Sequence, residues 1–461
     1  MVQLFSHWFP WHTVLRVTLE TVFLILSVVF AVALIDPGAF REMLGALPAL
    51  ALFALTVLLI NAALGLYQPT AKRSRRETAI RVFLSLVLAI PVAYLVFEHL
   101  PRAWAHHEVV ELIAVVAIAS HTVIRGYAAK VRSSSNVFLN RVLVVGTGAE
   151  AAAVKESIHK FGSDFRIVGF YPVGGSESVC VPQDNVFDGR SPLLEVARKN
   201  RVSQIVVAVG DRRGGGLPLN QLLDCKLAGV KVLDFSSYFE QVLGQVRLDS
   251  LRASWLIFGE GFRQGFLRTV VKRAFDILAS SFLLVLAAPL MLLAALLILL
   301  ENGFPFLYRQ ERVGQGGRVF QVVKFRSMRN DAELDGKPRW ATSNDDRVTR
   351  VGRVIRKLRI DELPQLLNVL KGDMSLVGPR PERPYFVGEL SQKIPFYVAR
   401  HSIKPGVTGW AQVRYPYGAS VDDASQKLQY DLYYVKNHSM FLDLVIFFET
   451  IEVVLTGRGA Q

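Results

Sequence analysis

The uncharged apolar run at residues 277–300 constrains this chain more than any other feature. It is long enough to cross a bilayer as a helix, so a membrane-spanning helix is its simplest interpretation. Pro289 lies in the middle, where proline removes a helical hydrogen bond and allows the chain to bend. Basic residues, which favour the cytoplasmic side, flank both ends; they are Arg268, Lys272 and Arg273 before the run, and Arg309, Arg312 and Arg318 after it. The pattern therefore favours a re-entrant helix-break-helix, with a membrane break at Pro289, over a simple span.

Four more apolar segments precede this run, at roughly residues 14–35, 44–66, 80–97 and 109–124. The first two are long enough to span, the third is marginal, and the fourth is short and contains Glu111. The basic residues at 72–76 separate the second segment from the third and indicate a cytoplasmic loop. Residues 1–132 are therefore expected to form a four-helix transmembrane domain in a multi-pass membrane protein.

Composition narrows the classes of partner. Hydrophobic residues make up 51% of the 461-residue chain, which is high for a soluble protein. The formal net charge of +14 suits anionic membrane lipids or nucleotide phosphates, and the apolar segments favour both over nucleic acid. Cys180 and Cys225 are the only cysteines and lie in no metal-ligand spacing, so neither a zinc site nor a disulfide framework is predicted.

A soluble α/β pattern begins at Arg141. The sequence RVLVVGTGAEAAAVKESI predicts a buried strand, a glycine turn and a helix, and it matches G-x-G-x-x-A through Gly146, Gly148 and Ala151. Further strand and helix signals predict a Rossmann-like domain over residues 137–250. No acidic residue closes a second strand about twenty residues further on, where ribose binding would require one. A structural or regulatory domain is favoured, and a nucleotide loop at Gly146 and Gly148 stays open.

An acidic pair lies in the segment 356–381, RKLRIDELPQLLNVLKGDMSLVGPRP. Leucines recur there at helical spacing, and Pro364 fits only a first helical turn. This predicts a helix that begins near Asp361, with Asp361 as its N-cap and with free N–H groups that attract phosphate.

A capped helix start is the simpler interpretation of Asp-Glu-Leu-Pro, but it does not explain the cations around it. Arg380 lies between two prolines, and several basic residues precede the acids; these are Arg353, Arg356, Lys357 and Arg359. Guanidinium groups pair well with phosphate oxygens. Together with two adjacent carboxylates, they suggest a nucleophile and a metal ligand that act on a diphosphate.

Three long motifs follow the apolar run in order: KFRSM, DELPQLLNVLKGDMSLVGPRP and KPGVTGWAQV. Through them the chain from about Lys272 resembles the bacterial sugar transferase family, the monotopic phosphoglycosyl transferases. With the amino-terminal segments and the Rossmann-like domain, it resembles the large form that initiates exopolysaccharide or O-antigen synthesis. The resemblance implies an α/β catalytic domain on a re-entrant membrane hairpin, over residues 265–461, that faces the cytosol from a bacterial inner membrane. One departure is Ala288 before Pro289, where small family members often carry serine.

The resemblance also implies a reaction. Asp361 would attack the sugar-linked phosphorus of a UDP-sugar, release UMP and carry the sugar phosphate until undecaprenyl phosphate accepts it. Glu362, with Asp361, would hold Mg²⁺. Arg356 and Arg380 match basic positions around the phosphates.

Two further expectations come from the same family. Lys324 and Arg326, in KFRSM, would help bind substrate at the membrane surface. A homodimer is expected from the family alone. The sequence does not identify the sugar.

Two other functional classes are weighed against the transferase. A membrane-tethered NAD-dependent nucleotide-sugar dehydratase would need a second dinucleotide fold with Tyr-x-x-x-Lys, and no lysine of the chain has that spacing. A non-catalytic membrane sensor would use the Rossmann-like domain but would leave the acidic pair and its cations unexplained.

Overall fold

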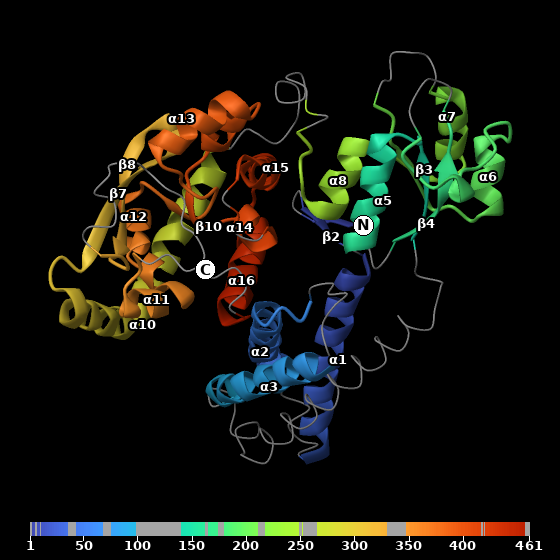
Figure 1. The fold of residues 1–461 in the computed structure, drawn as a ribbon. Helices are drawn as coiled ribbons and strands as arrows, with labels where there is room; N and C mark the ends of the chain where they lie inside the picture. The colour runs from blue at the N-terminus through green and yellow to red at the C-terminus, as the bar shows by residue number, and fades with distance from the viewer. Residues whose placement is uncertain are drawn as a thin grey trace. The chain divides into compact units, whose positions relative to one another are not determined.

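The computed structural model describes residues 2–4, 7–9, 11–35, 43–67, 75–97, 140–161, 165–173, 179–210, 217–248, 251, 265–329, 347–415, 418 and 420–456. The chain divides into two compact units (Figure 1). The first consists mainly of Phe9–Asn61 and Leu66–Leu243, and the second mainly of Gly244–Gln461.

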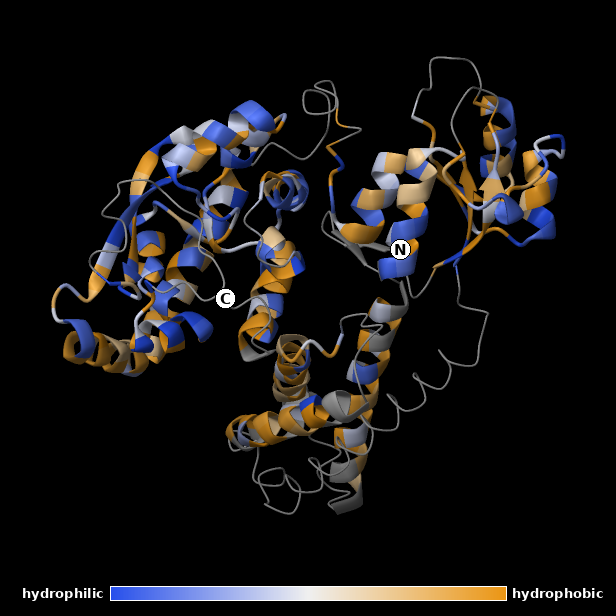
Figure 2. Ribbon diagram, in the orientation of Figure 1, coloured by the Kyte–Doolittle hydropathy of each residue, from blue (hydrophilic) through white to orange (hydrophobic). Residues whose placement is uncertain are grey.

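The amino-terminal helices coincide with the first three predicted apolar segments. They are α1 (Trp11–Ile35), α2 (Met43–Ala63) and α3 (Arg75–Phe97). Figure 2 shows how strongly hydrophobic residues dominate α2 and α3. Before them, β1 (Val2–Leu4) and β2 (His7–Phe9) pair as a two-stranded sheet. The fourth predicted segment, 109–124, lies outside the described residues.

A four-stranded parallel sheet in the order β4-β3-β5-β6 organises residues 140–243. The elements are β3 (Asn140–Val145), α5 (Ala149–Phe161), β4 (Phe165–Tyr171), η3 (Gln183–Asn185), α6 (Leu193–Lys199), β5 (Gln204–Val207), α7 (Leu219–Leu227), β6 (Lys231–Asp234) and α8 (Phe235–Leu243). This confirms the predicted parallel α/β architecture and the strand, turn and helix around Gly146.

The central strand β3 is apolar on both faces, as a parallel strand covered by helices should be. Val142 and Val144 pack with residues of α5 and α8. Leu143 and Val145 point the other way and pack with residues of α6 and α7. Figure 1 shows the resulting layers, with α5 and α8 on one face of the sheet and α6 and α7 on the other.

The long apolar run forms one helix, α10 (Phe266–Asn302), with Pro289 inside it. The helix is therefore not interrupted at Pro289, and the re-entrant course of this segment stays a prediction. In Figure 1 the two ends of α10 run in different directions. Its large apolar side chains are mostly exposed, with Phe282 at 68% and Val285 at 77%. Among the described helices, α1 and α10 contain stretches long and apolar enough to cross a membrane.

The described residues of the second unit form a large apolar core and a smaller one. The remaining elements of this unit are β7 (Leu307–Val313), η4 (Gln315–Gly317), β8 (Val319–Phe325), α11 (Arg350–Lys357), η5 (Ile360–Glu362), α12 (Gln365–Lys371), β9 (Ser375–Val377), α13 (Pro384–Lys393), η6 (Tyr397–Ser402), β10 (Gly406–Thr408), α14 (Trp410–Arg414), α15 (Val421–Asn437) and α16 (Met440–Thr456). Most of them pack on the large core, and α11 and η5 pack with α10 and β8 on the smaller one. Strands β7 and β8 form an antiparallel ribbon, and β9 pairs with β10 in parallel. Met374, Leu432 and Leu442 lie fully buried in the large core.

The second unit also includes residues 244–248. The Trp410 Nε1–H donates to the Gly244 carbonyl at 2.8 Å, and the Val246 N–H donates to the Gln429 carbonyl at 3.0 Å. The Val246 side chain is buried in the same core as Met374. The structure thus divides the chain at 243/244, whereas the sequence placed the boundaries at 250 and 265, because an irregular segment has no periodicity that reveals its packing.

Candidate active site

The acidic pair lies in a single 3₁₀ turn, η5, between two helices. Arg359 adopts a left-handed conformation, with φ of 58°, and directs the chain from α11 into this turn. The next helix, α12, begins at Gln365 with Pro364 at its N-cap position. The expected helix start and N-cap at Asp361 are therefore wrong, since Pro364 stands immediately before the first helical residue instead of inside the first turn.

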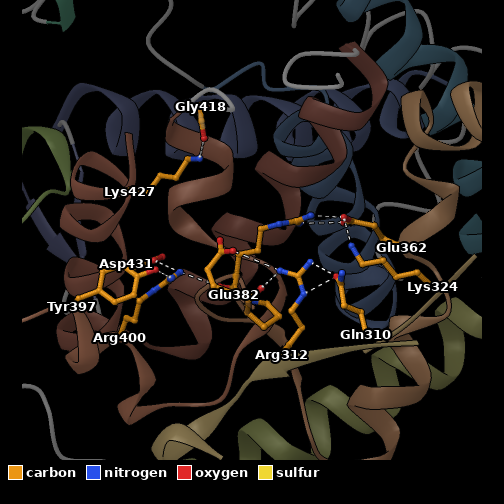
Figure 3. A network of polar contacts seen from close by, with 12 residues as sticks. Gln310, Arg312, Lys324, Glu362, Glu382, Tyr397, Arg400, Gly418, Lys427 and Asp431 are labelled. Carbon is orange, nitrogen blue, oxygen red and sulfur yellow. Dashed lines mark hydrogen bonds and ion pairs between the residues drawn. The ribbon is translucent and has the colours of Figure 1, made fainter. Parts of the chain in front are cut away.

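Glu362 is held by two cations. Its Oε1 accepts from the Arg380 Nη2 at 2.6 Å and from the Lys324 Nζ at 3.3 Å, and its Oε2 lies 3.4 Å from the Arg380 Nη1 (Figure 3). The glutamate is 9% exposed. Burial opposes its ionisation, but Arg380 and Lys324 outweigh burial and hold the pKa of Glu362 well below its usual value.

Asp361 has the opposite character, although it is the next residue. Burial and the neighbouring charge of Glu362 raise the pKa of Asp361 to about 6, and the attraction of Lys324, Arg356 and Arg380 does not cancel them. No hydrogen bond reaches its carboxylate from the part of the chain that the structure describes. The pair thus consists of an anchored glutamate whose charged form is stabilised and an aspartate whose charged form is less stabilised, which is the contrast expected of two carboxylates with different roles.

Three of the four predicted substrate-binding cations converge on this pair. Lys324 comes from β8, Arg380 from the loop after β9, and Arg356 from the last turn of α11, where its charge acts on Asp361. The side chains of Lys324 and Arg380 are 19% and 30% exposed, so they remain accessible to a phosphate. Segments distant in sequence therefore form one cationic site around two carboxylates.

Arg326 is placed elsewhere. Its Nη2 donates to the carbonyls of Asn302 and Gly303 at 2.9 and 2.6 Å, where α10 ends. This interaction satisfies carbonyl groups that a helix leaves free at its carboxyl end. The expectation that Arg326 binds substrate beside Lys324 is thus not supported. Strand β8 ends at Phe325, so the alternation that would align Arg326 with Lys324 stops before it.

Sequence reasoning assigned no role at the site to Arg312, Glu382 or Arg400. The register of the β7–β8 ribbon pairs Tyr308 with Lys324 and therefore places Arg312 on the same face as Lys324. Period-two spacing along RQERV could have revealed Arg312. Arg400 comes from η6, and no local pattern brings it near Arg380.

The donor set can be compared with the requirements of magnesium. The described residues contain no group of three or more His, Cys, Asp or Glu side chains that could hold a metal. Magnesium commonly uses only one or two carboxylates and completes its shell with water and substrate phosphates. None of the described residues donates a hydrogen bond to the Asp361 carboxylate, and among them Glu362 Oε2 has only a long contact, with Arg380. The two residues therefore fit Mg²⁺ that is bound together with a diphosphate.

The glycine turn of the first unit is explained by packing. Gly146 has φ of +123°, and a Cβ there would lie 2.0 Å from the Ala208 carbonyl oxygen. Both facts require glycine whether or not a ligand binds. Gly148 directly precedes α5. The structure thus gives Gly146 a reason to be glycine that involves the end of β5 and no nucleotide.

Comparison with known proteins adds information about the second unit. Residues 267–457 match the family model of the bacterial sugar transferases. The chain is 47% identical over 240 residues, 52% of its length, to a UDP-N-acetylgalactosamine-undecaprenyl-phosphate N-acetylgalactosaminephosphotransferase of Aeromonas hydrophila. The match spans little more than half, 56%, of that protein.

Two relatives that are named as glucose-1-phosphate transferases also match. A UDP-glucose:undecaprenyl-phosphate glucose-1-phosphate transferase of Caulobacter vibrioides is 48% identical over 192 residues, which are 41% of this chain and 71% of that protein. A protein of the same name from Xanthomonas campestris pv. campestris is 31% identical over 361 residues, 75% of this chain and 72% of that protein. The names of these relatives differ in the sugar that is transferred.

Proposed function

Because this chain belongs to the bacterial sugar transferase family, we propose that it transfers a sugar 1-phosphate from a UDP-sugar to undecaprenyl phosphate and releases UMP. The names of the relatives support the donor and acceptor classes, and the reaction would initiate the synthesis of an exopolysaccharide. The observation that carries the proposal is the buried pair Asp361 and Glu362 with its converging cations. This pair lies inside the matched region. Neither a dehydratase nor a sensor would require it.

The chemistry follows from the unequal pair. An Asp361 carboxylate oxygen attacks the phosphorus that bears the sugar, and the bond from that phosphorus to the UMP oxygen breaks with its electron pair on UMP. An oxygen of undecaprenyl phosphate then attacks the same phosphorus. The bond to Asp361 breaks and restores the carboxylate. Covalent catalysis of this kind divides one displacement into two.

The cations have two tasks. Lys324, Arg356 and Arg380 attract the diphosphate and stabilise the charge that develops on the leaving phosphate. Glu362 holds Lys324 and Arg380 in place before substrate binds. Mg²⁺, when bound by Asp361 and Glu362 together with the diphosphate, would neutralise part of the phosphate charge.

The proposal includes the setting of the site. The chain's relatives are named for action on undecaprenyl phosphate, and α1 and α10 contain long apolar stretches, so the protein associates with membranes. We infer that it is a multi-pass inner-membrane protein with four amino-terminal spans, that α10 is re-entrant, and that Asp361 faces the cytosol. The flanking cations of α10 support this orientation. The parallel α/β region would be a Rossmann-like structural or regulatory domain, and the family suggests a homodimer.

The test is UMP release by the full chain in nanodiscs with undecaprenyl phosphate, Mg²⁺ and a panel of UDP-sugars that includes UDP-glucose and UDP-N-acetylgalactosamine. We expect multiple turnovers with one donor, dependent on the lipid, abolished by a chelator and lost in Asp361→Asn. Asp422→Asn, an exposed aspartate of α15, is the matched control and should keep full activity. No release with any donor from folded protein would overturn the proposal.

A further inference from the structure

Arg380 reaches Glu362 from a loop, residues 378–382, whose backbone must be fixed for this contact to persist. The first anchor is the strand pair that precedes it: the Gly378 N–H donates to the Thr408 carbonyl at 2.9 Å, and the Gly406 N–H to the Pro379 carbonyl at 3.0 Å. These bonds hold the loop as far as Pro379, and the Val313 N–H holds its other end by donating to the Glu382 carbonyl at 2.9 Å. The carbonyls of Arg380 and Pro381 have other partners.

Arg312 of β7 binds the carboxyl-terminal end of this loop, at Pro381 and Glu382. Its Nη1 donates to the Pro381 carbonyl at 3.0 Å, and its guanidinium lies 3.6 Å from the Glu382 carboxylate. Its Nε and Nη2 both donate to Gln310 Oε1, at 3.1 and 2.6 Å. The Arg312 side chain is 16% exposed. The fork geometry of arginine therefore joins strand β7 to the loop through several bonds at once.

Arg400 is the second arginine that binds this loop; in Figure 3 it lies at the opposite end of the polar contacts from Glu362. Its Nη2 donates to the Arg380 carbonyl at 2.9 Å and lies 2.7 Å from the Asp431 carboxylate, while Nη1 donates to the Tyr397 hydroxyl at 2.7 Å. The Arg400 and Asp431 side chains are 6% and 2% exposed. A buried ion pair stabilises a fold little relative to apolar residues of similar size, so its value lies in the geometry that it imposes.

We propose that Arg312 and Arg400 are positioning residues, which hold the carbonyls of Pro381 and Arg380 so that the Arg380 side chain stays on Glu362. The two guanidiniums act through Arg380. The inference rests on the proposed function, because it assigns these residues to the same transfer reaction. It predicts that their effect on turnover depends on Arg380 being present.

A double-mutant cycle tests this dependence, with kcat and KM for the UDP-sugar measured by UMP release. Arg312→Lys keeps the charge but loses the fork, and we expect kcat to fall about tenfold, since small displacements of catalytic groups have effects of this order. In an Arg380→Lys background the same change should lower kcat less than about twofold, because contacting residues of one network are not additive. Equal losses in both backgrounds would overturn the proposal.

A second variant and a control separate positioning from general stability. Arg400→Lys should show the same dependence on Arg380 as Arg312→Lys. Arg414→Lys is the control, because Arg414 forms a comparable pair with Glu449 at 2.5 Å and packs on the Trp410 ring without contacting the loop. Its kcat should stay within about twofold of wild type, as expected of a site that does not share the network. A loss that matches that of Arg312→Lys would contradict the proposal.

A structure of the Arg312→Lys variant tests the inference without any activity. We expect the Arg380 guanidinium to leave the Glu362 carboxylate. If Arg380 remains bound to Glu362 at the wild-type distance, the inference fails, whatever the wild-type protein catalyses. Wild-type protein that releases no UMP would instead refute the proposed function, so the two failures are distinguishable.

Discussion

The turn at Asp361 and the turn at Gly146 both precede a helix, and both match sequence patterns of phosphate binding. At Asp361 charged side chains arrive from β8, from α11 and from the loop after β9, and they surround two carboxylates of unlike pKa. At Gly146 the glycine is required by contact with the Ala208 carbonyl. A local pattern thus specifies a backbone shape, whereas a reactive site requires side chains from distant segments.

The largest effect that separates the two turns is expected from Glu362→Gln. The amide cannot pair with both Lys324 and Arg380, so these cations lose their anchor, and the proposed Mg²⁺ site loses a ligand. We expect UMP release to fall about 10²–10³-fold, as when one preorganised electrostatic group is removed from an active site. Unchanged turnover would show that the pair does not organise the site.

Gly146→Ala probes the other turn and should act on stability alone. A Cβ at this position meets the Ala208 carbonyl at 2.0 Å, and φ of +123° is unfavourable for alanine. We expect the free energy of unfolding of the α/β region to fall by about 2–4 kcal/mol, in the range of strained backbone substitutions. Calorimetry would measure this. Lost turnover with an unchanged melting temperature would instead indicate a ligand at the glycine turn.

The pH dependence of turnover tests the difference between the two carboxylates. Because the pKa of Asp361 is raised to about 6, protonation below that pH removes the carboxylate that we propose as the nucleophile. UMP release from limiting UDP-sugar should fall about tenfold per pH unit there. Glu362, whose pKa is lowered, contributes no second limb near pH 6. A limb near the ordinary aspartate value would contradict the role of burial.

The same shift has a defined sign in stability. Between the usual aspartate pKa and about 6, the folded state binds a proton that the unfolded chain has released. The contribution of Asp361 to stability therefore falls as pH rises through this window. Denaturant titrations at several pH values give the free energy of unfolding as a function of pH. In this window Asp361→Asn should lose the negative contribution of Asp361 to that dependence. An identical pH dependence in the variant and the wild type would contradict the raised pKa.

The smallest effect is expected at Arg326, which the sequence grouped with Lys324. Arg326→Gln removes its two bonds to the end of α10 and should cost about 1–3 kcal/mol of stability, the usual cost of unsatisfied buried groups. The KM for the donor should stay constant, whereas Lys324→Gln should raise it. A raised KM in Arg326→Gln would show instead that Arg326 binds the substrate, as the sequence predicted.

The sequence predicted the structure best where hydrophobic periodicity or a long motif marked the segment. Apolar runs located α1, α2, α3 and α10, and alternating strand and helix patterns predicted the parallel sheet. Asp361, Glu362, Lys324, Arg356 and Arg380 were found from their motifs and do converge.

Other features depend on tertiary contacts that no local pattern contains. The start of α12 was misplaced because Pro364 is equally compatible with a position just before a helix and with a first turn. The helix α10 continues through Pro289, because a long helix tolerates one missing hydrogen bond, and its re-entrant course stays a prediction. Arg326 and Arg400 take their roles from partners far away in sequence, Asn302 and Asp431.

The most direct test of the central claim is the intact mass of the wild-type protein after incubation with its UDP-sugar and Mg²⁺, without undecaprenyl phosphate, followed by an acid quench. We predict an adduct with the mass of one sugar phosphate, one equivalent of UMP, and loss of the adduct when undecaprenyl phosphate is added. Asp361→Asn should form none. An adduct on Asp361→Asn, or turnover by wild type with no adduct and no UMP before the lipid is added, would contradict the assignment of Asp361 as the nucleophile.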